Sequence, residues 1–461
     1  MSETHLQANL SKADAEKPTM IRYAILLLLA SMAFILYLDR VCIGQAAPSI
    51  QEELKLSDKQ MGLVFGAFTI AYGIFEIPTG HWGDRFGSRG VITRIVIWWS
   101  AFTSLTGFAW NMSSMVAVRF LFGAGEAGAL PNTARVLRLW FPDKARGKAQ
   151  GIIATSMMVG GTLAPIVTLK LIDAFGWRMT FVILGALGVV WSSLFYWYFR
   201  DNPKDHAGTN EAERNLILAG RKESGKADEH LSIPWGAVLT CPNVWLMGGI
   251  MTCSAGVYYA IFSWYPTYLQ KGWGVDKNVS ANLTSLVLAG GAVGSLAGGF
   301  VVDQLVRHFT NERWNRTLFT CAMLLTGAGS LAYGLNSDSP YVMSACTSFT
   351  NVCLQLTVPT WWNVVTHISG HHVGAMFGMM NMLGIPGAFG SQYCLGALSE
   401  HYQKQGLSGR DQWDPGMSIF IVVLTVDAIL WLFVDPRRKI VPDDHISSPE
   451  EEETTLPLDE Y

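Results

Sequence analysis

The sequence predicts an all-α membrane protein with twelve transmembrane helices in two six-helix repeats and both termini in the cytoplasm. Half of the 461 residues are hydrophobic and only 15% are charged, against about 25% charged residues in an average soluble domain. The apolar residues gather in segments close to the length of about 20 residues that spans a bilayer. Lys and Arg residues are also divided unevenly between the loops of the two sides, which is typical of membrane proteins with a fixed orientation.

The apolar segments fall into two groups of six, each a candidate bundle. The first group covers roughly 22–47, 60–80, 91–110, 114–139, 147–172 and 178–199. The second group covers roughly 242–270, 280–304, 317–336, 340–364, 373–398 and 414–434. These limits predict a cytoplasmic N-terminal tail, an N-terminal bundle, a charged cytoplasmic linker, a C-terminal bundle and an acidic cytoplasmic tail, at 1–21, 22–199, 200–241, 242–434 and 435–461.

The orientation follows from the basic residues. If the N-terminus is cytoplasmic, 22 of the 33 Lys and Arg residues fall on the cytoplasmic side, 8 fall in the opposite loops, and the remaining three lie within the segments. This imbalance places both termini inside the cell, in a multi-pass protein of the cytoplasmic (inner) membrane.

The two halves repeat each other in part. Gly80 with Asp84, at the end of the second segment, recurs as Gly299 with Asp303 at the end of the eighth. A duplicated six-helix unit is the architecture of secondary transporters, which place the binding site between the repeats near the middle of the membrane.

Several other classes of function are disfavoured. A net charge of −3 argues against nucleic acid as a partner. The seven cysteines show no paired spacing and mostly lie in apolar segments, so we expect neither disulfides nor a metal site. His367, His371 and His372 cluster in one loop, where a cytoplasmic surface cluster is favoured over metal binding or pH sensing. No arrangement of residues suggests catalysis, so we expect no enzyme activity and no cofactor.

Charged residues inside the apolar segments are the main candidates for function, because each costs about 2.5–3.5 kcal/mol at the centre of a membrane helix on insertion scales. Asp39 and Arg40 adjoin in the first segment, and Arg119 and Glu126 lie seven residues apart in the fourth, on one helical face. Glu76 lies inside the second segment, near a charged loop. The pair Arg119 and Glu126 has two equally good interpretations: a functional pair that faces one cavity, or a fixed salt bridge.

The loop after the second segment carries a specific motif. Residues 80–89, GHWGDRFGSR, match the signature GxxxD(R/K)xGxR that marks the major facilitator superfamily. We expect Gly80, Asp84, Arg85, Gly87 and Arg89, with Asp303 in the second repeat, to close the cytoplasmic side in one conformation. The basic residues also serve to orient the chain.

The charged residues in the segments point to one branch of this superfamily. Tyr37, Asp39 and Arg40, with the run RFLFGAGEAGALP at 119–131, resemble the anion:cation symporter branch of the superfamily, over essentially residues 22–434. That branch includes bacterial galactonate, glucarate and hexuronate transporters and vesicular glutamate and sialic acid transporters. The resemblance implies movement of a small carboxylate, such as a sugar acid, together with a proton, by a monomer that alternates its access to the two sides.

The resemblance also implies roles for individual residues. Arg40 would meet the substrate carboxylate, Asp39 and Glu126 would take up protons, and Arg119 would pair with Glu126. The residues expected to contact the rest of the substrate are Tyr37, Tyr72, Thr360, Trp361 and Asn381.

This sequence departs from the family pattern at several positions, which are Glu76, His81, Met157 and Gln392. Met157 stands where an amide is common in sugar-acid carriers, so a shorter or more apolar anion, such as a tartrate or an aromatic carboxylate, is an alternative substrate. A sodium-coupled or uncoupled carrier and a nutrient sensor that does not transport are the alternative functions.

Overall fold

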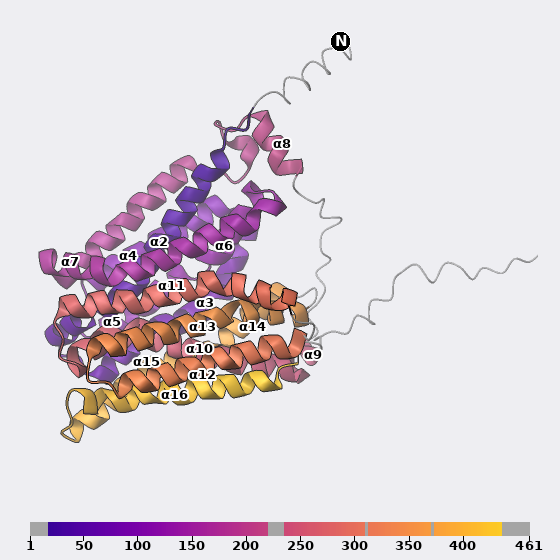
Figure 1. Ribbon diagram of the computed structural model, residues 1–461. Coiled ribbons are helices and arrows are strands. Elements are labelled where there is room, and N and C mark those ends of the chain that lie inside the picture. The colour runs from indigo at the N-terminus through magenta and orange to yellow at the C-terminus, as the bar shows by residue number, and fades with distance from the viewer. Residues whose placement is uncertain (1–16, 220–234, 309–311, 370–372, 436–461) are drawn as a thin grey trace, which may run out of the picture.

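The computed structural model describes residues 17–219, 235–308, 312–369 and 373–435. Every regular element within these ranges is a helix, and they contain no strand. Figure 1 shows the helices in two groups, with the N-terminal group (indigo to magenta) tilted against the C-terminal group (orange to yellow). The predicted all-helical architecture is therefore confirmed.

The N-terminal half is built from long helices joined by short connections. Its helices are α2 (Ile21–Leu54), α3 (Asp58–Phe86), α4 (Ser88–Thr106), α5 (Met112–Glu126), α6 (Ala129–Trp140) and α7 (Asp143–Tyr198). Within this half α2 and α4 pack along α7, and α3 packs along α5.

The C-terminal half repeats this plan after a connecting region. The connecting region contains η1 (Pro203–Asp205), α8 (Glu211–Ala219) and α9 (Trp235–Thr240). The half itself contains α10 (Pro242–Thr267), η2 (Tyr268–Gly272), α11 (Lys277–His308), α12 (Glu312–Leu335), α13 (Pro340–Ser369), α14 (Val373–Leu383), α15 (Ile385–Lys404) and α16 (Arg410–Phe433). Here α13 packs on α11 and α12, and α10 packs on α15.

Two of the predicted segments are divided in the structure, and one predicted boundary agrees with it. The segment predicted at 114–139 is broken between α5 and α6, where Gly128 has a φ of 86°, which favours glycine. The boundary predicted between 147–172 and 178–199 agrees with the interruption of α7 at Gly176, which has a φ of 77°. The segment predicted at 373–398 is divided into α14 and α15 at Gly384. Hydrophobic length alone does not reveal the breaks at Gly128 and Gly384, because the apolar residues continue across them.

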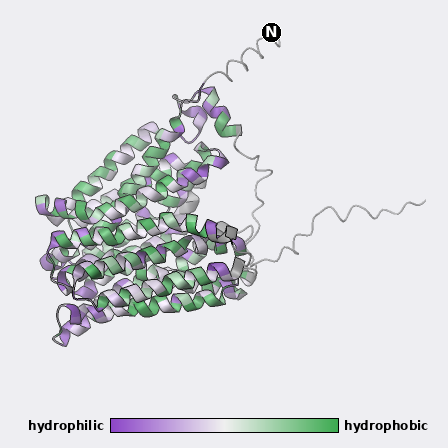
Figure 2. Ribbon diagram, in the orientation of Figure 1, coloured by the Kyte–Doolittle hydropathy of each residue, from purple (hydrophilic) through white to green (hydrophobic). Residues whose placement is uncertain are grey.

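Within the described ranges, six helices are long and apolar enough to cross a bilayer, namely α2, α7, α10 continued by η2, α11, α12 and α16. Figure 2 shows apolar residues along the helices and more hydrophilic ones toward their ends. The other helices fall short in length, in hydropathy or through their charged residues; α5, for example, has only 15 residues and buries both Arg119 and Glu126. Because such residues face neighbouring helices, hydropathy is a poor guide there, and the count of twelve stays a prediction.

The connecting region is anchored to the N-terminal half. The carboxylate of Glu213 in α8 accepts hydrogen bonds from the backbone N–H groups of Ile21 and Arg22, at 3.0 and 3.1 Å, and pairs with the Arg22 guanidinium at 3.1 Å. An acid at the N-terminus of a helix satisfies free N–H groups and complements the helix dipole. This end of the molecule is called the linker side below, and the opposite end the far side.

The two halves meet where α3 packs on α15, α7 on α11 and α2 on α10, and one stripe of α3 faces α14 and α15. Its members are Asp58, Gly62, Gly66, Thr69, Gly73 and Glu76, spaced by three or four residues so that they share a helical face. The glycines let the backbones approach closely: a Cβ at Gly62 would lie 2.6 Å from the backbone oxygen of Gln392. Thr69 donates a hydrogen bond to the Gln392 side chain at 2.9 Å. The halves are therefore in direct contact from the far side inward to Glu76.

We expect Gly62→Ala to lower the melting temperature of the purified protein by several degrees, because overpacking a close contact costs about 1–3 kcal/mol. Gly390→Ala is the matched control, since a Cβ at Gly390 meets nothing within 4 Å. Thermal unfolding of both variants and the parent measures the effect. Equal melting temperatures for all three proteins would show that the α3–α15 contact accommodates the added methyl group without loss of stability.

A polar cluster around Asp58 joins the halves at the far side. The Asp58 carboxylate, which is buried, accepts hydrogen bonds from Gln51 at 2.8 Å, from Lys271 at 2.7 Å and from Ser399 at 2.8 Å. Gln412 donates to Ser399 at 2.8 Å. Lys271, Ser399 and Gln412 belong to the C-terminal half, so this Asp58 cluster holds the far side closed.

Candidate functional site

A buried ion pair between α2 and α5 is the centre of the candidate site. The Arg40 guanidinium donates to Glu126 Oε1 through Nε at 2.8 Å and also through Nη2. Both side chains are almost fully buried, with Arg40 8% and Glu126 1% exposed. Glu126 is the last residue of α5, immediately before the break at Ala127 and Gly128. The other oxygen, Oε2, is buried and has no hydrogen-bond partner among the described residues.

Aromatic rings surround the Arg40 guanidinium. Its Cζ atom lies 4.8 Å from the centre of the Tyr72 ring and 5.2 Å from the centres of the Tyr37 and Phe68 rings. The faces of aromatic rings attract a cation and also exclude water from it. Arg40 is thus a buried positive charge that needs an anion, and Glu126 supplies that anion in this structure.

Arg119 and Asp39 lie beside this pair without direct hydrogen bonds of their own to it. Arg119 is 1% exposed, packs 4.3 Å from the centre of the Phe122 ring, and interacts electrostatically with Asp39 and Glu126. Both carboxylate oxygens of Asp39 are buried and unpartnered among the described residues. The four charged residues predicted from the sequence therefore lie together, in one interior region of the N-terminal half.

The expected partner of Glu126 is corrected by the structure. The family resemblance pairs Arg119 with Glu126, but the hydrogen bonds of Glu126 come from Arg40. The physical reason is the helix rise: seven residues along one helix separate Arg119 and Glu126 by about 10.5 Å. Arg40 reaches Glu126 across the space between two helices and is the nearer cation.

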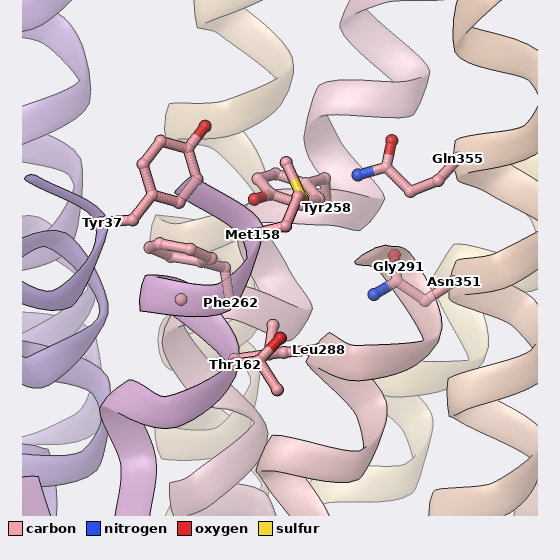
Figure 3. A pocket seen from close by; sticks show the side chains of 10 residues that line it. Tyr37, Met158, Thr162, Tyr258, Phe262, Leu288, Gly291, Asn351 and Gln355 are labelled. Carbon is pink, nitrogen blue, oxygen red and sulfur yellow. The ribbon is translucent and has the colours of Figure 1, made fainter. Parts of the chain in front are cut away.

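A first cavity adjoins Tyr37 and lies between the two halves. It is lined from the N-terminal half by Tyr37, Met158, Gly161 and Thr162, and from the C-terminal half by Tyr258, Phe262, Leu288, Gly291, Asn351 and Gln355. Figure 3 shows the amide group of Gln355 directed toward Tyr258 and Met158. The Asn351 amide donates to the backbone oxygen of Val287 at 3.0 Å, and its own carbonyl oxygen is buried without a partner in the described chain.

A second cavity lies on the other side of Arg40, also between the halves. It is lined by Thr69, Tyr72, Gly73, Glu76, Met251, Ala255, Tyr259, Asn381, Gly384, Ile385 and Ala388. Asn381 from α14 donates to Glu76 Oε2 at 2.7 Å, and the Tyr72 hydroxyl lies 3.5 Å from Glu76 Oε1. The predicted residues Tyr72 and Asn381 therefore meet at this cavity, with Glu76 between them.

Two predicted substrate contacts lie elsewhere. Thr360 is fully buried in α13, and its hydroxyl has no hydrogen-bond partner in the described chain. The Trp361 indole packs against Phe377 and donates to the backbone oxygen of Met247 at 3.4 Å, within the core of the C-terminal half. Neither residue lines the two cavities.

Only part of the predicted gating motif can be placed. Gly87 has a φ of 79° at the junction of α3 and α4, where the Asp201 carboxylate accepts hydrogen bonds from the backbone N–H groups of Ser88 and Arg89 at 2.7 and 3.0 Å. The Arg89 guanidinium donates to the backbone oxygen of Tyr196 at 2.6 and 2.9 Å. These contacts fasten α4 to the end of α7. The side chains of Asp84, Arg85 and Asp303, and the surroundings of Gly80, lie outside the described part of the chain, as do His371 and His372.

Several residues at the site were not singled out from the sequence. Tyr258 and Tyr259 line the first and second cavity respectively, and Asn351 and Gln355 lie one turn apart on α13. Two amides four residues apart in an apolar segment are a signal that could have been used, because they share one face of the helix. The tyrosine pair gives no such signal, since most aromatic residues in this chain fill the core.

Comparison with known proteins places the chain among membrane transporters. Residues 29–391 match the profile of the Major Facilitator Superfamily. The chain is 33% identical over 432 residues to a probable sulfoacetate transporter of Cupriavidus necator, covering 92% of this chain and 96% of that protein. It is 26% identical to a D-galactonate transporter of Escherichia coli, covering 84% of this chain and 92% of that protein.

The fold is also found among solved structures. The chain superimposes with a TM-score of 0.74 on a bacterial homologue of the human lysosomal transporter Spinster, in an inward-facing and unoccupied conformation. The two chains are 20% identical, and the match covers 90% of this chain and 97% of the other. This likeness supports the fold that the helix packing shows.

Proposed function

This chain belongs to the major facilitator superfamily, and from that premise we propose that it is a proton-coupled symporter of a small organic anion. Its relatives are named as transporters of organic acids, and the chain is a multi-pass membrane transporter rather than an enzyme. The substrate proposed here is a small carboxylate, with sugar acids and sulfoacetate as the first compounds to test.

One observation carries the proposal: a buried arginine that faces the region between the two halves has a buried glutamate as the only acid at salt-bridge distance in the described chain. Arg40 is enclosed by the rings of Tyr37, Phe68 and Tyr72, and its guanidinium is held by Glu126. A carboxylate of the substrate would compete with Glu126 for the same planar donors, which suit bidentate binding. Substrate and Glu126 therefore bind Arg40 in turn.

Competition for Arg40 couples the anion to a proton. When a substrate carboxylate takes Arg40, the Glu126 carboxylate would remain buried without its partner, which is costly as long as it is charged. Protonation of Glu126 removes that cost. Asp39, buried and unpartnered, is a second group that is favoured in the neutral state for the same reason. Anion binding and proton uptake thus favour each other, as linkage requires.

The proposed transport cycle uses the contacts between the halves. With the linker side taken as cytoplasmic, from the distribution of Lys and Arg, the Asp58 cluster and the α3–α15 stripe close the extracellular side. Opening that side requires these contacts to separate while the linker ends approach each other. Such rocking of two repeats about a central site is the general scheme of these carriers.

Uptake into proteoliposomes tests the function. Labelled sulfoacetate, D-galactonate and a panel of other carboxylates are offered with and without an inwardly directed proton gradient. We expect accumulation of at least one compound, and its loss when the gradient is collapsed. Uptake that does not depend on the proton gradient but depends on a sodium gradient would show that sodium is the coupling ion. Tight binding without any uptake would favour a sensor.

The Asp58 cluster gives a separate test of alternating access. Asp58→Asn is expected to raise extracellular labelling of a Thr162→Cys reporter, which lines the first cavity, by about tenfold or more. Each hydrogen bond to a charged group contributes about 1.5–3 kcal/mol, and Asp58 accepts several.

Intact cells and a membrane-impermeant maleimide measure the labelling, with the chain lacking the reporter as background. Glu52→Gln, an exposed acid on the same side, is the control. If Asp58→Asn and Glu52→Gln label at the same rate, the cluster does not hold this side closed.

A further inference from the structure

Glu76 is a half-buried acid at the meeting point of the two halves, and the proposed mechanism does not use it. It lies on the stripe of α3 that faces the C-terminal half, where it lines the second cavity. Its carboxylate accepts the Asn381 amide hydrogen bond across the interface at 2.7 Å. It is the acid of α3 that reaches the middle of the molecule, since Asp58 lies at the far side.

Among the side chains that the structure describes, the polar groups that act on Glu76 are the Arg40 cation, tyrosine hydroxyls and an amide. Tyr72 on its own helix lies 3.5 Å away, Tyr259 of α10 lines the same cavity, and the Arg40 charge of α2 acts on it. Toward the linker side, Asn132 of α6 lies close to the backbone of Thr79 in α3. Arg40 is therefore the cation that Glu76 shares with Glu126.

Counting the charges shows why Glu76 matters. Asp39, Glu126 and Glu76 are acids, whereas Arg40 and Arg119 are the bases of this region. With all of them ionised, the region has one negative charge in excess before an anion arrives. Burying a further anion there is unfavourable unless protons neutralise the acids.

Glu76 also accepts a hydrogen bond from the Asn381 amide, a donor that the substrate would use. The Asn381 amide, predicted to bind the substrate, donates to Glu76 Oε2, just as Arg40 donates to Glu126. The two internal carboxylates thus hold the donors that an organic anion would use. A neutral Glu76 would bind Asn381 less strongly, because hydrogen bonds to charged groups are stronger than those between neutral ones.

We propose that Glu76 is a second proton-binding site, and that anion binding requires one proton on Glu76 in addition to the proton on Glu126. The proton enters from water in the cavity and is held on the Glu76 carboxyl, which releases the Asn381 amide N–H to the anion. When the anion leaves, the proton leaves with it, and Glu76 again accepts the Asn381 hydrogen bond. This inference rests on the proposed proton-coupled function.

The pH dependence of anion binding tests the proposal. For every proton taken up on binding, the dissociation constant rises about tenfold per pH unit once the group is ionised in the free protein. Binding of sulfoacetate, or of D-galactonate if sulfoacetate does not bind, is measured on the purified full-length protein across the neutral and alkaline range. We expect the slope for Glu76→Gln to be lower by about one proton than the slope for the parent.

Two further variants separate a proton site from a structural role. Glu76→Asp keeps the acid and is expected to keep the steep slope, even if its affinity changes. Glu52→Gln removes an exposed acid outside both cavities and is expected to match the parent. A structural role would change the affinity of Glu76→Gln equally at every pH.

The outcomes distinguish this inference from the function on which it rests. If the parent binding is pH dependent and Glu76→Gln has the same slope, Glu76 is not a proton site, and the symporter proposal is unaffected. If the parent binds these anions with no pH dependence, or transports none of the panel, both proposals fall together. A lower slope in Glu76→Gln alone, with Glu76→Asp unchanged, supports the second proton.

Discussion

Glu126→Gln is expected to reduce accumulation of the substrate driven by a proton gradient far more than exchange of substrate across the membrane, which continues within a few-fold of the parent rate. A glutamine keeps the size of the side chain and can still accept a hydrogen bond from Arg40, but it cannot take up or release a proton. The carrier would then behave as though Glu126 were permanently neutral. Exchange needs only the loaded carrier to move, whereas accumulation needs the proton.

The measurement compares two uptake assays in the same proteoliposomes. One assay imposes a proton gradient on empty vesicles, and the other follows labelled substrate into vesicles preloaded with unlabelled substrate. Glu400→Gln, an acid paired with Lys404 outside both cavities, is the matched control and is expected to retain both activities. Equal loss of accumulation and exchange in Glu126→Gln would show that Glu126 is needed for folding or binding rather than for proton coupling.

Arg40→Lys is expected to weaken anion binding by about ten- to hundredfold, because a hydrogen bond to a charged group contributes about 1.5–3 kcal/mol and each 1.4 kcal/mol is a factor of ten. Lysine keeps the charge but loses the planar pair of donors that now meet Glu126 through Nε and Nη2. Its compact, strongly hydrated ammonium group also fits less well against the rings of Tyr37 and Tyr72.

Equilibrium binding on purified protein measures this effect. Arg138→Lys, which changes an exposed arginine, is the control and is expected to bind like the parent. An unchanged affinity in Arg40→Lys, with both variants folded to the same melting temperature, would remove Arg40 from the anion site.

The sequence was sufficient to predict which charged residues lie together. Asp39, Arg40, Arg119 and Glu126 stood out because charges are costly inside apolar segments, and that cost brings such residues to a shared interior in any helical bundle. The pairing within the group was not predictable from the spacing of residues along one helix. It depends on how α2 faces α5, and hence on Arg40 reaching Glu126 across the space between them.

The contacts between the two halves were harder to predict. Asp58 looks like an ordinary acid at a helix N-terminus, and Lys271 like an ordinary loop lysine, until the fold brings them to 2.7 Å. The break at Gly128 was also missed, because hydrophobic length does not record a change of backbone conformation. Glu76 was visible as an unusual charge, but its partner Asn381 lies 305 residues further along the chain.

Proton uptake on anion binding is the most direct test of the claim that Glu126 and the substrate compete for Arg40. The purified protein is mixed with the anion in weakly buffered solution near neutral pH, and a pH-sensitive dye reports the change. We predict that the solution becomes more alkaline as the parent binds the anion, and that Glu126→Gln takes up about one proton fewer. Anion binding by the parent with no change in pH would contradict the account.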